Sequence, residues 1–374
     1  MRPSFPALSL GILLAVSAIA QTPGTVVEFP VRYSINPAVE TGACHPAPTG
    51  STHEITYNKN GGETLWITGQ NYDRVVQVKQ DGAMTFYDMG EKSGPHGIEF
   101  DGSNRLWVTL EFKSQIVRLD SLGRIVQTID VALPCASCPD GKLPTHPHGL
   151  AFGKDKQTIW FTGKATGTVG RISPDGKLTT YVLENVGSVP IYVHPANDED
   201  GTIFVTELVG NAIARINPKT GEVTEIPIPT HNSRPIAIVP QPGSSVMWFT
   251  EEAGNRIAKI DAKDPSNKIT EFPLPLTQSN VILAGLAFDS DGNLWVQQYV
   301  DQNNPTPANP SPAGGDYIIK IDKSIVTATD ISSVPITYYK VPSTQTVMHR
   351  IVQGPDGNMW FTELGINKVG KLTR

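Results

Sequence analysis

Charged side chains are scarce in this sequence, because Asp, Glu, Lys and Arg together make up only 18% of its 374 residues. The formal net charge is −6, so the chain lacks the basic face that nucleic-acid binding requires. Beyond the first twenty residues it also lacks any apolar run approaching the roughly 18 residues that cross a bilayer. These absences predict that neither nucleic acid nor a membrane is a partner.

The first twenty residues are predicted to be a signal peptide. Arg2 supplies a positive start, residues 8–19 an apolar stretch, and residues 18–20 the small side chains of a cleavage site. The apolar stretch is too short to span a membrane. We therefore expect residues 21–374 to form a single secreted, extracellular domain, and we expect it to be a monomer.

Cysteine is also rare, with only Cys44, Cys135 and Cys138 present. In an oxidising compartment three cysteines allow one disulfide and leave one thiol. Cys135 and Cys138 have the spacing of a redox motif, but prolines flank the pair and no βαβ pattern surrounds it. We expect a disulfide that staples a loop, with Cys44 bonded either to Cys135 or to Cys138.

Glycine and proline, in contrast, are abundant, with 34 and 31 residues, which favours short strands joined by tight turns. All six tryptophans stand in one recurring phrase of the Trp-Phe-Thr type, and phenylalanine replaces tryptophan in a seventh copy. Repeats spaced in this way are typical of propeller blades. The seven phrases are centred on Trp66, Trp107, Trp160, Phe204, Trp248, Trp295 and Trp360.

Each phrase has a short apolar segment upstream, a turn often of the Asp-Gly kind, and alternating strands downstream. Four short strands repeated seven times predict an all-β, seven-bladed β-propeller. The last repeat stops after a third strand at residues 367–372, and residues 26–30 supply the missing fourth. We expect these two terminal strands to pair and close the last blade. Residues 301–316 are expected to be a surface loop of the sixth blade.

One face of such a ring is the expected functional site. First strands begin there and second strands end there, so the residue after Pro and the Glu after Trp-Phe-Thr should gather around one mouth. Packing explains the repeated aromatics, but converging charged groups and imidazoles near a channel are costly unless they bind something. Loop residues His45, His146 and His231 are expected to be solvated, and His194 to be structural. The candidates at the mouth are His96, His148, His349, Glu111, Glu207, Glu251 and Glu363.

Several phrases resemble the virginiamycin B lyase (streptogramin lyase) family. They are Pro95-His96-Gly97-Ile98, Trp248-Phe249-Thr250-Glu251, and Trp360-Phe361-Thr362-Glu363 followed by residues 367–372. The resemblance covers essentially the whole chain after the predicted signal peptide. It implies a metal-assisted C–O lyase that opens a cyclic depsipeptide at its ester by β-elimination, with a histidine base, neighbouring glutamates and Mg²⁺.

The match to the family's catalytic pattern is partial. Gly94 stands where the family has a glutamate before Pro-His-Gly, and Ile236 replaces a histidine of the family's Arg-Pro-His-Ala segment. In the final blade, where the family carries its catalytic motif, this chain has Val347-Met348-His349-Arg350.

Our leading hypothesis is a secreted lyase or hydrolase that acts on an ester- or lactone-like small molecule at the mouth. Removal of a proton next to a carbonyl needs a base with a pKa near the working pH, which suits histidine. The base is expected to be His96 or His349. Glu111 and Glu363 are expected to act beside it as orienting or metal-holding carboxylates.

The remaining candidates are assigned to binding. We expect His148, Glu207 and Glu251 to contact the substrate, and Glu251 and Glu363 to hold Mg²⁺. Two alternatives stay open at this point. One is a non-catalytic propeller that binds a ligand or partner at the same mouth, and the other is a Ca²⁺-dependent lactonase of the gluconolactonase type.

Overall fold

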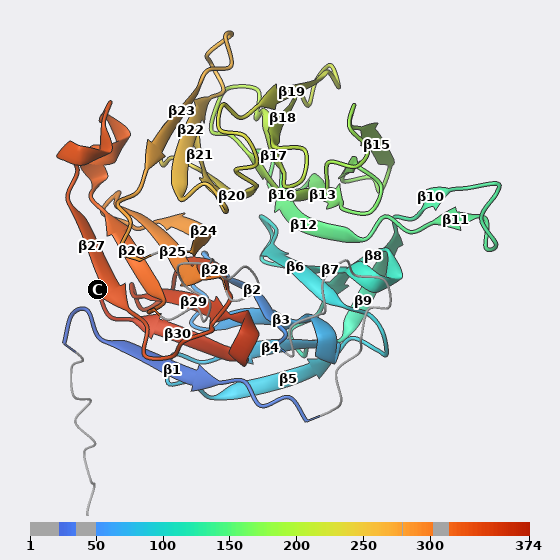
Figure 1. Cartoon of the computed structure of the whole chain (residues 1–374). Helices are drawn as coiled ribbons and strands as arrows, with labels where there is room; N and C mark the ends of the chain where they lie inside the picture. The colour runs from blue at the N-terminus through green and yellow to red at the C-terminus, as the bar shows by residue number, and fades with distance from the viewer. Residues whose placement is uncertain (1–21, 35–49, 279, 302–313) are drawn as a thin grey trace, which may run out of the picture.

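The computed structural model describes residues 22–34, 50–278, 280–301 and 314–374. The predicted signal peptide, Cys44, His45 and most of the loop at residues 301–316 lie outside the described residues. Within the described ranges the chain folds into seven four-stranded antiparallel sheets arranged around a ring (Figure 1). The predicted all-β, seven-bladed β-propeller is therefore confirmed.

The inner half of each blade corresponds to the apolar segment and the tryptophan phrase of one repeat. Blades are numbered 1 to 7 in the order of their first strands. These are β2 (Thr52–Tyr57), β6 (Pro95–Phe100), β12 (Pro147–Phe152), β16 (Pro190–Pro195), β20 (Pro235–Pro240), β24 (Val281–Phe288) and β28 (Met348–Gln353). The second strands are β3 (Leu65–Gly69), β7 (Leu106–Leu110), β13 (Ile159–Gly163), β17 (Ile203–Glu207), β21 (Val246–Glu251), β25 (Leu294–Val300) and β29 (Met359–Glu363).

The outer half of each blade comes from the alternating segments downstream. The third strands are β4 (Arg74–Val78), β8 (Gln115–Leu119), β14 (Thr168–Ile172), β18 (Ala212–Ile216), β22 (Arg256–Asp261), β26 (Tyr317–Ile321) and β30 (Lys368–Leu372). The fourth strands are β5 (Met84–Asp88), β9 (Ile125–Asp130), β15 (Leu178–Val182), β19 (Val223–Pro227), β23 (Ile269–Pro273), β27 (Ile336–Lys340) and, from the amino end, β1 (Val26–Pro30).

Short elements complete the described part of the chain. A small hairpin, β10 (Leu133–Pro134) and β11 (Lys142–Leu143), projects from the ring between blades 2 and 3 (Figure 1). The 3₁₀ turns are η1 (Gln70–Tyr72), η2 (Glu111–Lys113), η3 (Lys323–Val326), η4 (Ile331–Ser333) and η5 (Leu364–Ile366). Among the described residues, no helix has the length and apolar character needed to cross a membrane.

The ring is closed by the two ends of the chain, as predicted. Strand β1 pairs antiparallel with β30, with Val26 opposite Leu372 and Pro30 opposite Lys368. The first strand of each blade contacts that of the next, and β28 contacts β2. Closure pairs strand edges that would otherwise be open, and it makes blades 7, 1, 2 and 3 consecutive around the ring.

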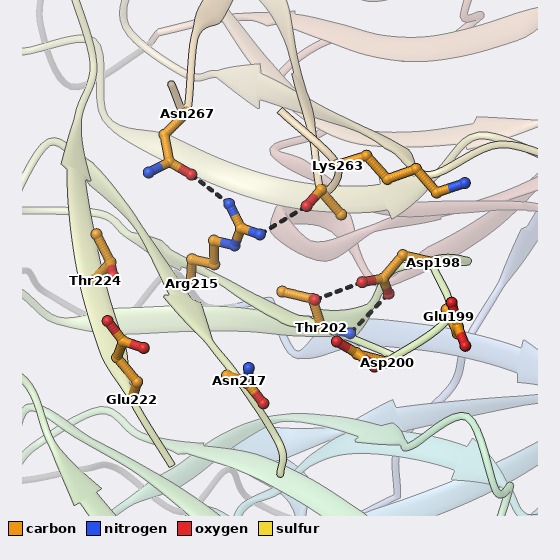
Figure 2. Close-up of a pocket in the computed structure, with 11 residues that line it drawn as sticks. Asp198, Glu199, Asp200, Thr202, Arg215, Asn217, Glu222, Thr224, Lys263 and Asn267 are labelled. Carbon is orange, nitrogen blue, oxygen red and sulfur yellow. Dashed lines mark hydrogen bonds between the residues drawn. The ribbon is translucent and has the colours of Figure 1, made fainter. Parts of the chain in front are cut away.

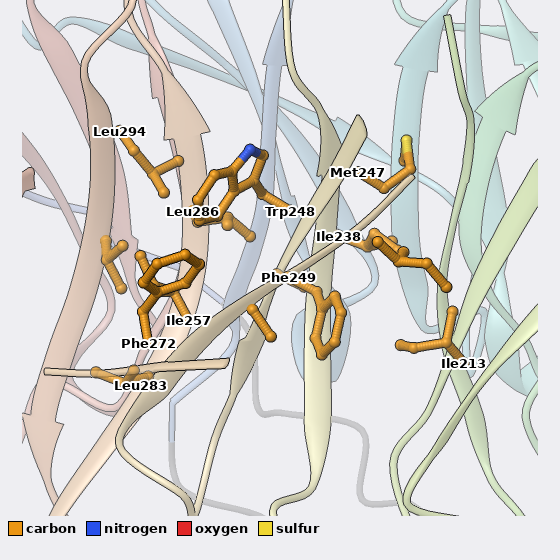
Figure 3. Packing of buried hydrophobic residues seen from close by; sticks show 14 of the residues in the cluster. Ile213, Ile238, Met247, Trp248, Phe249, Ile257, Phe272, Leu283, Leu286 and Leu294 are labelled. Carbon is orange, nitrogen blue, oxygen red and sulfur yellow. The ribbon is translucent and has the colours of Figure 1, made fainter. Parts of the chain in front are cut away.

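The tryptophans pack inside and between the blades. In blade 5, Trp248 is fully buried and stacks on Phe272 of the fourth strand, with ring centroids 5.6 Å apart. Figure 3 shows these rings beside Leu286 and Leu294 of blade 6. Blades 1, 3, 6 and 7 repeat the stack with Trp66–Tyr87, Trp160–Tyr181, Trp295–Tyr339 and Trp360–Phe29. Core packing therefore accounts for the aromatic residues of the repeat.

The threonine of the repeat links one blade to the next. In blade 3 the backbone N–H of Gly149 donates to Thr162 Oγ1 at 2.8 Å, and this hydroxyl donates to the Ile191 carbonyl of blade 4 at 2.9 Å. This buried hydroxyl therefore has both a donor and an acceptor as partners, as buried polar groups usually do. The same pair of bonds is made by Thr109, Thr206, Thr250 and Thr362, and Gln297 takes this role in blade 6.

The disulfide joins Cys135 to Cys138, so the expected pairing of Cys44 with either residue is wrong. The two cysteines lie in a tight turn, in which the N–H of Cys138 donates to the carbonyl of Cys135 at 3.2 Å. That turn holds their Cα atoms 5.4 Å apart, which is within the range a disulfide needs. The expected stapling of a loop is met by this local bond at the tip of the β10–β11 hairpin.

Candidate functional site

Each first strand carries a β-bulge near its start, and the bulge decides where the next side chains point. In β6 the ladder pairs Pro95 with Leu110 and then Ile98 with Val108, so His96 and its neighbour face a single residue of β7. A bulge re-aims the side chains of the unpaired residues. The same register shift occurs in all seven blades, so every first strand has two unpaired bulge residues at the same position.

The first bulge residue is a histidine in four consecutive blades, 7, 1, 2 and 3, and we call these four residues the histidine cluster. The ring centroids of His96 and His148 lie 3.6 Å apart, those of His53 and His96 5.0 Å, and those of His96 and His349 5.4 Å. The last distance joins blades that are not neighbours, so the rings meet on the axis. The equivalent residues of blades 4, 5 and 6 are apolar: Ile191, Ile236 and Ala284.

The second bulge residue adds a charged network beside the cluster. His349 Nδ1 lies 3.1 Å from Glu54 Oε1, and the Tyr192 hydroxyl donates to the same oxygen from the far side of the ring. Arg350 Nε lies 3.6 Å from Glu54 Oε2, and its guanidinium covers the Tyr192 ring at 4.9 Å. Burial raises the pKa of Glu54, but Arg350 and His349 outweigh it and lower the pKa to about 2. The carboxylate is therefore ionised at neutral pH.

Glu111 stands on the other side of the cluster, one residue beyond the end of β7. Its carboxylate accepts from Lys164 Nζ at 2.7 Å and from Gln70 Nε2 at 2.6 Å. His146 Nδ1 lies 3.9 Å from the same carboxylate, so His146 contacts a site residue and is not simply solvated as expected. Burial raises the pKa of Glu111, but Lys164 and His146 lower it well below the usual value.

The glutamates at the ends of β17, β21 and β29 lie elsewhere. Each is fully buried, and neither carboxyl oxygen of Glu363 has a hydrogen-bond partner among the described residues. Burial raises the pKa of Glu207 to about 7 and those of Glu251 and Glu363 to about 8. A carboxylate on the fourth strand of the same blade adds to each shift. These neighbours are Glu225, Glu271 and Glu28, respectively. The interactions described for the three glutamates do not include the histidine cluster.

The imidazoles of His53, His96 and His148 are neutral near pH 7. Burial, followed by the charge of His349, lowers the pKa of His53 to about 3. Burial likewise lowers the pKa of His148 to about 4, although Glu111 opposes the shift. Burial and the neighbouring imidazoles hold the pKa of His96 well below its usual value. Neutral imidazoles offer a lone pair to a proton or a metal ion.

The structure thus places the predicted candidates in two groups. His96, His148, His349 and Glu111 come together at the ring centre, whereas Glu207, Glu251 and Glu363 point into their own blades. The sequence also contained a signal for four residues of the site that were not among the predicted candidates. His53 occupies the same position in its repeat as the other cluster histidines, and Glu54, Tyr192 and Arg350 stand where other blades have Gly or Ala.

Two groups of side chains at the centre have metal-ligand geometry. They are Glu54, His96 and His349, and His96, Glu111 and His148, and within each group the ligand atoms lie within 4.8 Å of one another. Both nitrogens of His96 are buried with no hydrogen-bond partner in the described part of the chain. An unpaired buried polar atom costs free energy, so a ligand that bonds to His96 would relieve it.

A hollow of about 450 Å³ lies at the other face of the ring, between blades 4 and 5. Figure 2 shows its lining, where Asp198 accepts from Thr202 and Arg215 donates to Asn267. Asp198 and Thr202 follow the end of β16, whereas the cluster residues stand at the starts of the first strands. The hollow and the cluster are therefore separate features.

The sequence comparisons with known proteins match one family. The sequence model of the virginiamycin B lyase family matches residues 40–304. A virginiamycin B lyase from Nocardia farcinica is 32% identical over 211 residues, which are 49% of this chain and 70% of that protein. A streptogramin B lyase structure superposes with a TM-score of 0.70 at 22% identity, covering 93% of this chain and 96% of that one. A catalytically inactive virginiamycin B lyase from Staphylococcus aureus with quinupristin gives 0.70 at 25% identity, covering 94% and 99%.

Proposed function

The chain belongs to the virginiamycin B lyase family, and from that membership we propose that it is a secreted lyase that breaks a C–O bond of an ester- or lactone-like small molecule by β-elimination. The observation that carries the proposal is the contact of 3.1 Å between His349 Nδ1 and Glu54 Oε1. A carboxylate in this position fixes which imidazole nitrogen carries the proton.

His349 is the better candidate for the base of the two that the sequence suggested. Because Nδ1–H donates to the ionised Glu54, Nε2 keeps its lone pair and can accept a proton. The His349 side chain is 14% exposed, whereas His96 is 1% exposed and has no carboxylate bonded to it. A base must reach the proton that it removes, so exposure and orientation both favour His349.

The proposed reaction balances without water. His349 Nε2 takes the proton from the carbon next to a carbonyl, and the electron pair left behind forms a carbon–carbon double bond. The ester oxygen on the following carbon leaves with its bonding pair as a carboxylate. The products are an unsaturated carbonyl compound and a free acid, which remain one molecule when the substrate is cyclic.

In the proposed reaction, Arg350 stabilises the negative charge that develops on the substrate carbonyl. Its Nη1 is buried with no hydrogen-bond partner among the described residues, while Nε lies near Glu54. A fixed donor aimed at developing charge in a site without bulk water lowers the barrier more than the same donor in water. Arg350 and the Glu54–His349 pair thus supply the donor and the base that elimination needs.

The residues present do not fit the Mg²⁺ that the family resemblance implies. Mg²⁺ requires oxygen ligands in near-octahedral geometry, but the ring centre offers mainly imidazoles. Glu251 and Glu363 belong to blades 5 and 7, and burial raises their pKa to about 8, so both are protonated at neutral pH. We therefore assign no step of the reaction to Mg²⁺.

The proposal is tested by incubating the protein with cyclic depsipeptides, lactones and simple esters and analysing the products by mass spectrometry. Elimination gives an unsaturated product without added water, and hydrolysis gives a gain of one water. With a confirmed substrate, His349→Ala should lower kcat by about a hundredfold or more, as expected for loss of a general base. Glu54→Gln should also lower kcat, because an amide does not enforce the reactive tautomer.

His194→Ala is the matched control. His194 is also half-buried on a first strand, and its Nδ1 donates to the Pro195 carbonyl outside the cluster. The control and the His349 variant should unfold at similar temperatures. Full turnover by His349→Ala would exclude His349 as the base, and loss of turnover only in His96→Ala would move the role to His96.

A non-catalytic ligand-binding propeller is the second candidate. The bond between Tyr192 and Glu54 crosses the ring axis, and the first bulge residues of blades 4 to 6 are apolar. A polar bond across the centre and an apolar wall on one side are features of a site that binds a small molecule. Saturable binding of a test compound with no product by mass spectrometry would favour this candidate.

A further inference from the structure

We propose that His96, His148 and Glu111 bind a divalent transition-metal ion of the zinc type at the centre of the ring. The three side chains come from blades 2 and 3, and their ligand atoms lie within 4.8 Å of one another. Zinc binds imidazole nitrogen and carboxylate oxygen at about 2.0–2.2 Å. Small side-chain rotations would therefore bring all three atoms onto one ion.

His148 and His96 can each bind a metal ion, for different reasons. His148 Nδ1 lies 3.2 Å from the Ile191 carbonyl, so this nitrogen carries the proton and Nε2 has a free lone pair. A metal-bound histidine usually donates its other N–H to a carbonyl or carboxylate in this manner. His96 is 1% exposed, and neither of its nitrogens has a hydrogen-bond partner among the described residues. A metal ion at His96 would satisfy a buried nitrogen that the protein leaves unpaired.

Glu111 supplies the negative charge of the site. Gln70 Nε2 and Lys164 Nζ bond to different oxygens of its carboxylate, at 2.6 and 2.7 Å, and hold the group in place. A carboxylate has about four lone-pair positions, so these two bonds leave room for a metal. The Lys164 side chain is 34% exposed and can turn toward solvent when a cation binds.

The chemistry of the donors selects the metal. Two imidazoles and one carboxylate suit Zn²⁺ and its neighbours in the transition series, whereas Mg²⁺ and Ca²⁺ prefer oxygen ligands alone. Three protein ligands also leave a coordination position for water or a substrate. The site is thus distinct from a Mg²⁺ site built from glutamates, and it does not depend on the proposed lyase activity.

The other group with metal-ligand geometry is less suited to a cation. Its carboxylate, Glu54, faces Arg350, which carries a permanent charge and is held over the Tyr192 ring with its side chain only 17% exposed. Arg350 therefore cannot move away from Glu54 as easily as Lys164 can move away from Glu111. We therefore place the metal at His96, His148 and Glu111, and we keep Glu54 and His349 as a hydrogen-bonded pair.

The test is calorimetric titration of untagged protein, stripped with EDTA, with ZnCl₂ and separately with MgCl₂. We expect one Zn²⁺ per chain and no comparable binding of Mg²⁺. His148→Ala and Glu111→Gln should each weaken Zn²⁺ binding at least tenfold, whereas His349→Ala and His194→Ala should bind as the wild type does. Co²⁺ gives a second readout, because its visible absorption reports coordination by the protein.

Thermal unfolding without metal shows whether each variant is folded, and added Zn²⁺ should raise the Tm of the wild type but not that of His148→Ala. If His148→Ala does not fold, the same measurements are made on Glu111→Gln instead. The proposal is overturned if Zn²⁺ does not bind, if Mg²⁺ binds equally well, or if His349→Ala abolishes binding while His148→Ala does not. Because no substrate is used, these outcomes are independent of whether the chain is a lyase.

Discussion

Replacing Glu363 with Gln tests whether this carboxyl is a buried acid of the fold or an ionised group of a metal site. Glu363 is fully buried at the end of β29, and both its oxygens lack a hydrogen-bond partner among the described residues. Burial, followed by the charge of Glu28, raises the pKa of Glu363 from 4.5 to about 8. At neutral pH the folded protein therefore keeps a proton on this side chain.

The sign and size of the effect follow from the two pKa values. Between pH 4.5 and about 8 the folded state holds a proton that the unfolded chain releases, so stability falls as the pH rises. Each pH unit costs about 1.4 kcal/mol, which sets an upper limit of about 5 kcal/mol by pH 8. An amide does not titrate. We expect Glu363→Gln to match the wild type within about 1 kcal/mol near pH 5 and to be more stable by about 2–4 kcal/mol near pH 9.

Urea unfolding followed by tryptophan fluorescence at pH 5, 7 and 9 measures the difference. Glu63→Gln, at an exposed position of blade 1, controls for the loss of one negative charge and should show no pH-dependent gain. A difference between Glu363→Gln and the wild type that stays constant with pH would refute the raised pKa. A variant less stable than the wild type at pH 9 would mean that Glu363 is ionised and paired in the folded protein.

Two further predictions concern the way the blades join. A Cβ on Gly97 would lie 2.5 Å from the His148 carbonyl oxygen, so Gly97→Ala should lower the free energy of unfolding by about 1–3 kcal/mol. A Cβ on Gly187 would meet only Asn185 Oδ1, at an ordinary contact distance of 3.5 Å, so Gly187→Ala should change the free energy of unfolding little in the same urea titration. Thr162→Val removes the hydroxyl that links blades 3 and 4 and should lower the free energy of unfolding by about 2–4 kcal/mol. Thr85→Val, at an exposed strand position, should not lower it. An equal effect of the two changes would contradict the bridging role of the threonine.

The repeat made the fold predictable from the sequence. Seven tryptophan or phenylalanine phrases with fixed neighbours determine strand type and order, because each copy places the same apolar and turn residues at the same positions. The pairing of residues 26–30 with the last strand could also be predicted, since the final repeat lacks one strand. Both predictions depend only on the order of apolar, turn and aromatic residues along the chain, which can be read directly from the sequence.

The histidine cluster was only partly predictable. The sequence aligns His96, His148 and His349 at one position of the repeat, but their contact depends on ring closure, which brings blade 7 beside blade 1. His53 stands in the same position, where a Thr-His-Glu sequence obscures the Pro-His-Gly pattern. Glu54, Tyr192 and Arg350 come from blades 1, 4 and 7, and only the bulges and the closed ring bring them together.

A difference of one residue separates the two kinds of glutamate, and the sequence did not reveal it. Glu207, Glu251 and Glu363 are the last residues of their second strands, whereas Glu111 follows the last residue of β7. Glu111 begins the 3₁₀ turn η2, where the alternation of side chains in a strand no longer applies, and there its carboxylate lies near the histidines. Glu363 is still part of β29, and its carboxyl lies near Glu28 on the fourth strand of the same blade. The sequence by itself thus determined the repeat, the strands and the closure of the ring. Only the tertiary structure decided which carboxylates meet the imidazoles, because that choice depends on register and on contacts between blades far apart in the chain.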